Sequence, residues 1–380
     1  MRLEDGLGDV RAGFASGDDK VDGVRHLRMN NVTRDGQLDF SRVRRVAPSS
    51  RQRERQSLSV GDVVINVTNS AELVGKSVLV RELTEETLFS NHFLRLRADK
   101  ARLHPPYLQH FLRLHFDRRT FESRAKKWVG QATLDRSDLL GLPIPTTDLQ
   151  EQRRIAAILD QADELRAKRR RSLALLDELP ERIFAQRFLS VGRAVSPLGD
   201  LAAWQSGGTP SRSQTKFFSG DIPWMTSGEL GPVRAKWSNE MLTTEAIASS
   251  SAKIIPHGSL LLGMYDTAAL KSSISVGRIA CNQAVAFGVP SPGVSPEFLY
   301  FAVRSQRPSV LARRRGARQK NLNLSMIRSI AVPTASAGEQ TEFSDVVRTV
   351  EAVRAAAEAH LAHLDELFAS LQHRAFTGQL

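Results

Sequence analysis

The residues that could carry out covalent chemistry form no complete constellation in this sequence. Cys281 is the only cysteine, so there is neither a disulfide pair nor a cysteine-based metal site. Gly75-Lys76-Ser77 has only the end of a phosphate-binding loop, and no complete loop of that kind occurs elsewhere. The sequence therefore gives no sign of an ATP-driven motor.

One motif is a single residue away from a catalytic loop. His104-Pro105-Pro106-Tyr107 resembles the Asp/Asn-Pro-Pro-Tyr loop of adenine methyltransferases. That chemistry needs a side-chain oxygen at the first position to accept from the target amine, and His104 offers none. A related segment, Ser295-Pro296-Glu297-Phe298, lacks the second proline, as expected of a helix start. We predict no catalytic residue, no metal and no cofactor.

The charge of the chain favours a polyanionic partner. The 380 residues carry a formal net charge of +12, and DNA is the commonest polyanion that such an excess attracts. An arginine-rich genome would give the same composition, so charge alone does not decide.

Residues that can read base edges cluster around predicted strand ends. Asn and Gln bond adenine bidentately, whereas Arg and Lys read guanine. Half or more of these candidates could instead cap turns or fill the core. In the first half of the chain they are Asn30, Asn31, Asn66, Thr68, Asn69, Lys76 and Asn91, and in the second half Thr209, Trp224, Ser227, Tyr265, Lys271, Arg278 and Gln283.

A second set of basic residues suits phosphate contacts, which position a protein on DNA without specifying sequence. These residues are Lys126, Lys127, Arg314, Arg318 and Lys320.

The elements that must position these residues occur twice along the chain. Glu151-Gln152 and Glu339-Gln340 each begin a long helical stretch, at an offset of 339 − 151 = 188 residues. The same offset superimposes Leu176-Asp177-Glu178-Leu179 on Leu364-Asp365-Glu366-Leu367. Further upstream, Leu7-Gly8-Asp9 lies over Leu198-Gly199-Asp200 at an offset of 198 − 7 = 191. The chain is therefore expected to contain two copies of one unit, each a globular part followed by a long helix.

The two helical stretches show apolar residues alternating every three and four positions, which is typical of a coiled-coil seam. We expect the helices to pair antiparallel, because the second globular part then bridges two points at the same end of the pair. The predicted seam consists of Ile155, Ile158, Leu165, Leu176 and Leu179 in the first helix, and Phe343, Val346, Val353, Leu364 and Leu367 in the second.

Three segments resemble type I restriction-modification specificity subunits. Leu142-Pro143-Ile144-Pro145 followed by Glu151-Gln152-Arg153-Arg154-Ile155 is similar to their central region. Ser206-Gly207-Gly208-Thr209-Pro210 followed by Gly220-Asp221-Ile222-Pro223-Trp224 resembles the start of a target recognition domain. The ending from Ser370 to Gly378 is similar to their C-terminal region.

The resemblance implies an α+β fold: two mixed target recognition domains separated by an antiparallel pair of long helices, with pseudo-twofold internal symmetry. The expected boundaries are residues 1–148 and 191–336 for the domains, and 149–190 and 337–380 for the helices. The implied partners are double-stranded DNA at a bipartite site, two methyltransferase subunits, and restriction subunits through them.

Two other interpretations remain open from the residues. A coiled-coil scaffold that binds only proteins would explain the helices, but not two basic domains that differ so much between copies. A fused methyltransferase-specificity protein would need a cofactor loop. The polar, acidic N-terminal stretch and the absence of a long apolar run predict a cytoplasmic protein with no membrane partner.

Overall fold

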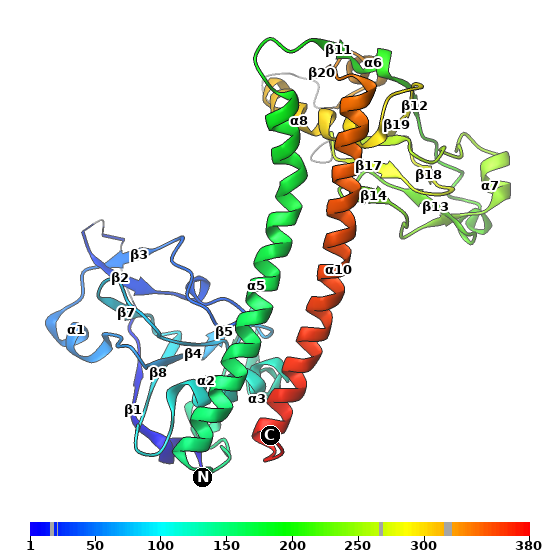
Figure 1. Cartoon of the computed structure of the whole chain (residues 1–380). Helices are drawn as coiled ribbons and strands as arrows, with labels where there is room; N and C mark the ends of the chain where they lie inside the picture. The colour runs from blue at the N-terminus through cyan, green and yellow to red at the C-terminus, as the bar shows by residue number, and fades with distance from the viewer. Residues whose placement is uncertain (16–18, 21, 266–268, 315–320) are drawn as a thin grey trace. The chain divides into compact units, whose positions relative to one another are not determined.

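The computed structural model describes residues 1–15, 19–20, 22–265, 269–314 and 321–380, without the side chains of residues 313 and 314. The chain divides into two compact units. Unit 1 contains residues 1–170 and 359–380, and unit 2 contains residues 171–358. Both mix helices and strands, as Figure 1 shows.

Unit 1 is built on an antiparallel sheet with the order β1-β8-β4-β6. Its strands are β1 (Leu7–Ala12), β8 (Phe93–Ala98), β4 (Val63–Asn66) and β6 (Ser77–Leu79). Helix α2 (Pro105–Asp117) packs against this sheet and buries Leu108, Phe111 and Leu112. These side chains recur every three to four residues, so they form one helical face, and burying that face stabilises the unit.

Two smaller sheets complete unit 1. In the order β3-β2-β7, strands β2 (Val24–Leu27) and β7 (Thr87–Phe89) run parallel, and β3 (Arg44–Val46) is antiparallel to β2. The other sheet has the order β5-β10-β9, from β5 (Thr68–Asn69), β10 (Gln131–Thr133) and β9 (Lys126–Trp128). The short helices are η1 (Leu3–Gly6), η2 (Met29–Asn31), α1 (Ser50–Gln56), α3 (Thr120–Arg124) and α4 (Arg136–Leu140).

Unit 2 has a five-stranded sheet with the order β12-β19-β16-β17-β14. Its strands are β12 (Ala202–Ser206), β19 (Val285–Pro290), β16 (Leu260–Gly263), β17 (Ser272–Ser275) and β14 (Arg234–Ala235). A second sheet, β15-β13-β18, consists of β15 (Met241–Leu242), β13 (Ile222–Met225) and β18 (Ala280–Cys281). A two-stranded sheet pairs β11 (Val195–Pro197) with β20 (Ala331–Pro333). Helices α6 (Leu198–Leu201), η3 (Thr215–Phe218), α7 (Thr244–Ala248), α8 (Pro296–Arg314) and α9 (Leu324–Arg328) complete the unit.

The two units repeat one topology. Strands β1-β8-β4-β6 correspond to β12-β19-β16-β17, and the parallel pair β2-β7 corresponds to the parallel pair β13-β18. The upstream match of Leu7 with Leu198 is wrong, however. The Leu3 amide donates to Leu142 O and the Leu198 amide to Ile330 O, each at 2.9 Å, so Leu3 is the counterpart of Leu198. The letters Leu-Gly-Asp at residue 7 instead begin β1.

The same glutamine fixes the start of both long helices. In unit 1, Gln152 Oε1 accepts from the His104 amide at 2.8 Å, and its Nε2 donates to Thr147 O at 2.9 Å. In unit 2, Gln340 Oε1 accepts from the Ser295 amide and its Nε2 donates to Ala335 O, both at 2.9 Å. The Gln-based alignment at offset 188 is therefore confirmed.

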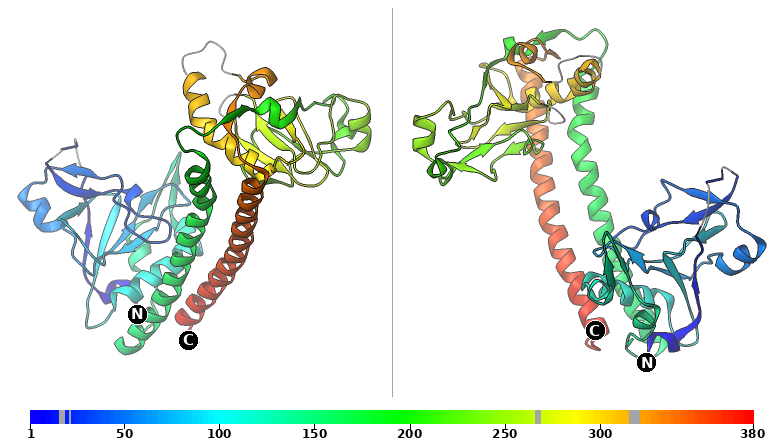
Figure 2. Two further views of the ribbon diagram at one scale, coloured as in Figure 1. Left: turned by 45° about the horizontal axis from the view of Figure 1, so that its top comes forward. Right: turned by 180° about the vertical axis from the view of Figure 1, so that it is seen from behind.

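The two long helices are α5 (Leu149–Phe188) and α10 (Ala337–Phe376), of 40 residues each. Within unit 1, Arg166 pairs with Asp365 at 2.6 Å, and Arg154 donates to Leu380 O at 2.8 Å. Within unit 2, Asp177 pairs with Arg354 at 2.6 Å, and Arg187 with Glu342 at 3.5 Å. Along these contacts the residue number rises in α5 as it falls in α10 and the residues after it, so the two helices run antiparallel in each unit. Both views of Figure 2 show the paired segments, and the predicted fold class is confirmed.

The predicted coiled-coil seam is wrong at four positions. Leu165, Leu179, Val353 and Leu367 are 49%, 38%, 50% and 51% exposed. The seam was inferred from two helices alone, whereas each unit also buries a helical stripe against its globular part. In unit 1 that stripe includes Ile155, Ala156 and Leu159.

The remaining predicted seam positions are not all alike. Ile155 and Phe343 are buried, whereas Ile158, Leu176, Val346 and Leu364 are half-buried. Phe343 joins Phe184 and Phe188 in the core of unit 2. The helices therefore contribute to the domain cores as well as to their own pairing.

Candidate nucleic-acid interface

A cleft of about 370 Å³, lined mostly by polar residues, opens in unit 1 where two parallel strands end side by side. Strand β2 ends at Leu27 and β7 at Phe89, and these two residues are register partners. The chain leaves β2 into η2 and leaves β7 into Ser90-Asn91-His92, and both segments line the cleft. We call four of its lining residues, Arg28, Asn30, Arg44 and Asn91, rim 1. Arg44 is half-buried, and the other three are exposed.

A glycine allows the neighbouring backbone to approach this point. A Cβ on Gly13 would lie 2.2 Å from both Phe89 O and Ser90 O. Gly207 has the same place in unit 2, where a Cβ would lie 2.2 Å from Cys281 O. Any side chain at either position would push the strand ends apart, so glycine is required there.

The cleft is positively charged. Arg28 and Arg44 line it, and the described lining residues include no carboxylate. His26 forms part of the floor, and burial together with the charges of Arg28 and Arg44 lowers its pKa to about 4. His26 is therefore neutral near pH 7.

Unit 2 places different side chains on the same backbone. Strands β13 and β18 end at Met225 and Cys281, which are register partners as Leu27 and Phe89 are in unit 1. Trp224 therefore occupies the position of His26, and Gln283 that of Asn91. The Asn282 amide donates to Met225 O at 3.0 Å, as the Ser90 amide donates to Leu27 O at 3.0 Å. We call the three polar side chains of this place, Thr209, Ser227 and Gln283, rim 2.

Rim 2 is neutral and partly pre-organised. The Thr209 hydroxyl donates to Gln283 Oε1. Trp224 is buried beneath, and its Nε1 donates to Gly208 O at 3.0 Å. Trp224 is thus a structural residue and not the base contact that the sequence predicted, because its only polar atom is already bonded inside the domain.

Four of the predicted base contacts in unit 1 also have structural roles: Asn31, Asn66, Asn69 and Lys76. Asn31 is buried and donates to Asp39 O and Arg42 O, at 2.9 and 2.8 Å. Asn66 is buried and donates to Thr68 O and His92 O, at 3.2 and 3.0 Å, and its Oδ1 accepts from Asn69 at 2.5 Å. Lys76 is buried, and its Nζ donates to Val32 O at 2.6 Å. Their hydrogen-bonding capacity is used within the domain, and Asn66 fixes the backbone of His92 beside rim 1.

Three further predicted residues belong to neither rim. Thr68 is half-buried, with its hydroxyl 3.5 Å from that of Thr133. Tyr265 is 36% exposed and lies two residues after the end of β16, and Arg278 is exposed beside the turn at Gly277.

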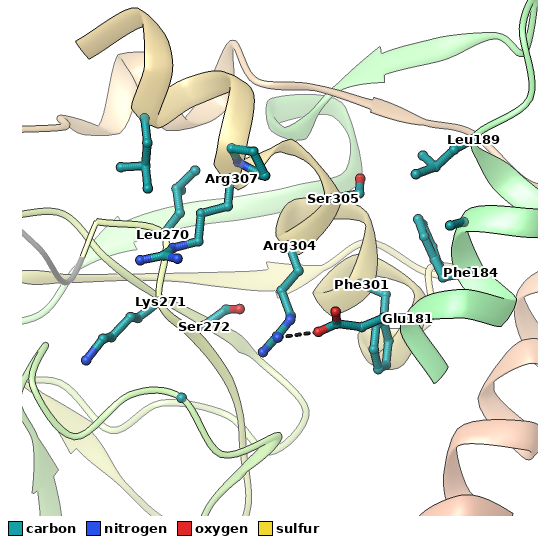
Figure 3. Close-up of a pocket in the computed structure, with 14 residues that line it drawn as sticks. Glu181, Phe184, Leu189, Leu270, Lys271, Ser272, Phe301, Arg304, Ser305 and Arg307 are labelled. Carbon is teal, nitrogen blue, oxygen red and sulfur yellow. Dashed lines mark hydrogen bonds and ion pairs between the residues drawn. The ribbon is translucent and has the colours of Figure 1, made fainter. Parts of the chain in front are cut away.

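Lys271 lines a separate pocket of about 600 Å³ in unit 2, which Figure 3 shows. Phe184, Leu270 and Phe301 form part of its apolar wall. Arg304, also in its wall, pairs with Glu181. Lys271 therefore belongs to this pocket and not to rim 2.

The predicted phosphate contacts are described only in part. Lys126 and Lys127 are exposed on β9 and pair with Asp135 at 2.6 Å and Glu122 at 3.6 Å. Arg314 is the last residue of α8. Arg318 and Lys320 lie outside the described residues.

Sequence reasoning missed Arg28, Arg44 and His26. Arg28 is two residues before Asn30 and follows the end of a strand, which was the signal used for the asparagines. The signal for Arg44 and His26 is tertiary, because β3 reaches the cleft only by pairing with β2.

The Asp/Asn-Pro-Pro-Tyr-like segment starts a helix, as its counterpart at Ser295-Pro296 does. Pro105 and Pro106 are the first two residues of α2, and Tyr107 is buried. Burial and the charge of Arg153 lower the pKa of His104. No group of three or more His, Cys, Asp or Glu that could hold a metal occurs among the described residues. Within the described parts of the chain, every helix is too short or too polar to cross a bilayer.

The fold defines a class of protein with two copies of one α/β unit, each built on antiparallel segments of two long helices. The chain belongs to the family described as the type I restriction modification DNA specificity domain, whose profile matches residues 60–175 and 191–363.

Curated relatives support the assignment over part of their length. The chain is 24% identical over 220 residues to the type I restriction enzyme EcoR124I/EcoR124II specificity subunit of Escherichia coli, which covers 54% of each protein. It is 30% identical over 166 residues to a putative type I restriction enzyme MjaX specificity subunit of Methanocaldococcus jannaschii, covering 43% of this chain and 39% of the relative. The chain thus spans about half or less of the curated relatives it matches.

Solved structures share the fold. The S subunit of a type I restriction-modification system from M. genitalium has a TM-score of 0.59 at 14% identity, covering 99% of this chain and 95% of that one. A chain from a study of assembly and conformational transition of the type I R-M system has a TM-score of 0.62 at 16% identity, covering 100% and 97%.

Proposed function

We propose that this chain is the DNA-reading specificity subunit of a type I restriction-modification complex. Unit 1 reads one part of a bipartite DNA target and unit 2 reads the other. The chain carries no catalytic centre and works in the cytoplasm. It recruits two methyltransferase subunits and, through them, restriction subunits.

The observation that carries the proposal is the pair of rims. The backbone is the same at both, yet rim 1 presents two arginines and two asparagines whereas rim 2 presents Thr209, Ser227 and Gln283. Asparagine and glutamine suit adenine, arginine suits guanine, and hydroxyls bond either. Two equivalent places with different hydrogen-bonding groups favour two different half-sites.

The experiment replaces the rims one at a time. Asn30→Ala/Asn91→Ala should relax base preference in one half-site only, and Thr209→Ala/Gln283→Ala in the other, at about 1–3 kcal/mol for each lost bidentate contact. Methylation-motif sequencing of cells that carry each variant measures this. Gln37→Ala and Asn239→Ala, on exposed residues outside the rims, are the matched controls.

Altered preference in both half-sites from one rim would contradict the two-reader proposal. A chain that assembles with its partners but does not bind DNA would instead be a protein scaffold.

Exposed apolar side chains on the helices support two copies of one partner. In unit 1, Leu165 and Leu367 lie beside the ion-paired Arg166 and Asp365. In unit 2, Leu179 and Val353 are exposed near the pair of Asp177 with Arg354. The internal repeat relates Leu165 to Val353 and Leu179 to Leu367 at the offset of 188. Each unit therefore presents an equivalent apolar pair, as binding two identical subunits requires.

The number of bound methyltransferase subunits tests this part. Leu165→Gln/Leu367→Gln and Leu179→Gln/Val353→Gln change exposed residues, so both variants should fold. Each should retain one methyltransferase subunit in place of two by mass photometry. Retention of two subunits by both variants would show that the partner binds elsewhere.

A further inference from the structure

A second cleft in unit 1, of about 730 Å³, is lined almost entirely by charged residues. Its walls come from β1, β8, helix α1 and the segment after α1. Five arginines face it with two carboxylates, and no apolar side chain does. The lining residues are Asp9, Arg11, Arg51, Glu54, Arg55, Ser57, Ser59, Arg95 and Arg97.

Two of the arginines are held rigidly by the domain. Arg95 is only 4% exposed, and it donates to Ser57 O at 2.8 Å and to Asp9 Oδ2 at 2.5 Å. Its Nε has no hydrogen-bond partner in the described structure. Arg97 makes a bidentate ion pair with the buried Asp62: its Nε donates to Oδ1 at 2.7 Å and its Nη2 to Oδ2 at 2.9 Å.

Among the other lining residues of the cleft, three arginines face two carboxylates. Asp9 already accepts from both Arg11, at 3.0 Å, and Arg95. Burial alone would raise the pKa of Asp9, but these two arginines hold it below its usual value, so the carboxylate is charged and paired with both. Arg51 and Arg55 lie one turn apart on α1, and no ion pair is recorded for either among the described residues. The cleft thus retains an excess of positive charge.

The residues of unit 2 that correspond to this cleft in the described structure lack its arginines. By strand register, Arg11 corresponds to Gln205, Arg95 to Phe287 and Arg97 to Val289. Helix α7 takes the place of α1, and its sequence, Thr-Glu-Ala-Ile-Ala, contains no arginine. The positive cleft is therefore a property of one copy and not of the fold.

We infer that this cleft binds phosphate groups of the DNA backbone next to the half-site read by unit 1, so that the two units hold DNA with unequal electrostatic strength. The inference rests on the proposed DNA-reading function. Arginine forks match phosphate oxygens bidentately, and backbone contacts of this kind fix register without reading sequence.

The composition of the cleft favours a DNA backbone over a free nucleotide. A nucleotide site needs an apolar or aromatic wall for the base, and the lining residues provide none. The cleft and rim 1 are linked through the buried Phe89, because the Arg95 guanidinium lies 6.0 Å from its ring centroid and Phe89 is the last residue before Ser90-Asn91. DNA bound at rim 1 would continue past the arginines.

The test compares three single variants of one short helix in the full chain: Arg51→Gln, Arg53→Gln and Arg55→Gln. Arg53 is the matched control, because it pairs with Glu86 at 3.5 Å and does not line the cleft. Binding of a 30-base-pair duplex is measured between 50 and 200 mM salt by fluorescence anisotropy. Each contact with a phosphate adds about 0.9 to the slope of log affinity against log salt.

Arg51→Gln and Arg55→Gln should each lower that slope by about 0.9, equally on duplexes with and without the target, and Arg53→Gln should leave it unchanged. A slope unaltered in all three variants, or lowered equally in all three, would overturn the inference. ATP binding is measured in parallel. If wild type binds ATP, and Arg51→Gln and Arg55→Gln lose ATP binding but keep duplex binding, the inference is overturned and the cleft is assigned to nucleotides. If wild type shows no target preference while the two cleft variants still lower the slope, the proposed function fails and the phosphate cleft stands.

Discussion

Lys76 and Lys271 occupy the same place in the two copies of one loop, yet their surroundings differ. The residue before each lysine has a positive φ, +90° at Gly75 and +55° at Leu270. The Gly75 amide donates to Asn66 O at 2.7 Å, and the Leu270 amide to Gly263 O at 2.9 Å. In unit 1 the ring of Phe121 packs against Gly75, and the ammonium of Lys76 is buried on carbonyl oxygens. In unit 2 the side chain of Leu270 is itself buried, and Lys271 lines a pocket.

This difference separates what a repeat preserves from what it does not. The backbone hydrogen bonds recur, because they define the turn between two paired strands. The side chains are free to change as long as each copy fills its own core. Position in the repeat therefore predicts where a residue lies but not which chemistry it performs.

The largest expected effect comes from exchanging the residues before the lysines. Gly75→Leu places a Cβ 2.2 Å from the Phe121 ring, at a φ that strains any side chain. We expect unit 1 to lose at least about 4 kcal/mol of stability, measured by hydrogen exchange of its amides. Leu270→Gly relieves strain in unit 2 but leaves a cavity, for a loss of about 2–3 kcal/mol. Equal stability of Gly75→Leu and wild type would show that Phe121 moves aside.

The second largest effect should be a loss of stability at acidic pH that is greater in unit 1 than in unit 2. Burial, with nearby arginines, lowers the pKa of His26 and of His115 to about 4, from a usual value of 6.5. Between these values the unfolded chain binds more protons, so the stability of unit 1 falls as the pH falls from 6.5 towards 4. From pH 7 to 5 the loss is about 2 kcal/mol for each histidine.

Trp224 replaces His26 in unit 2 and cannot titrate, so unit 2 lacks this part of the loss. Urea unfolding with exchange readout at both pH values measures the difference. The His26→Gln and His115→Phe variants should each remove about half of the effect in unit 1, and an unchanged pH dependence in both would contradict the assignment.

The two helix-starting glutamines should behave alike. Gln152→Ala and Gln340→Ala each remove two matching contacts of a buried side chain, and Gln152→Ala also removes a bond to Arg102 O at 3.0 Å. Each should cost its own unit about 2 kcal/mol. Exchange protection of α2 and α8 reports the two losses separately. Losses that differ by more than about 1 kcal/mol would show that the copies use this contact differently.

The smallest effect tests the lysines themselves. Lys76→Met leaves Met29 O and Val32 O without their donor, and we expect a loss of about 1.5 kcal/mol in unit 1. Lys271→Met should change the stability of unit 2 by less than about 0.5 kcal/mol. Thermal unfolding of each variant beside wild type provides the measurement, and a larger loss at Lys271 would reverse the comparison.

Sequence periodicity and the repeat predicted the fold well but the site only in part. The helix starts and the duplication follow from local signals such as Gln152 and Pro105. The rim residues could not all be predicted from local signals, because Arg44 reaches the cleft through strand pairing that no local pattern encodes. Asn30 and Asn31 are adjacent and chemically identical, yet one is exposed and the other bonds two carbonyls. Exposure is a tertiary property, so residue type alone could not separate them.

Unit 1 is built from two separate segments of the chain, and this affects the order in which the chain can fold as it is synthesised. Its core includes Phe368 and Ala375, from a segment that begins at residue 359, whereas unit 2 is one continuous stretch, residues 171–358. The ribosome therefore finishes unit 2 before unit 1 receives its last helix. Nascent chains commonly fold from the N-terminal domain onward. Here the first domain to emerge is the last that can close its core, and until then the apolar surface that contacts Phe368 and Ala375 lacks its partner helix.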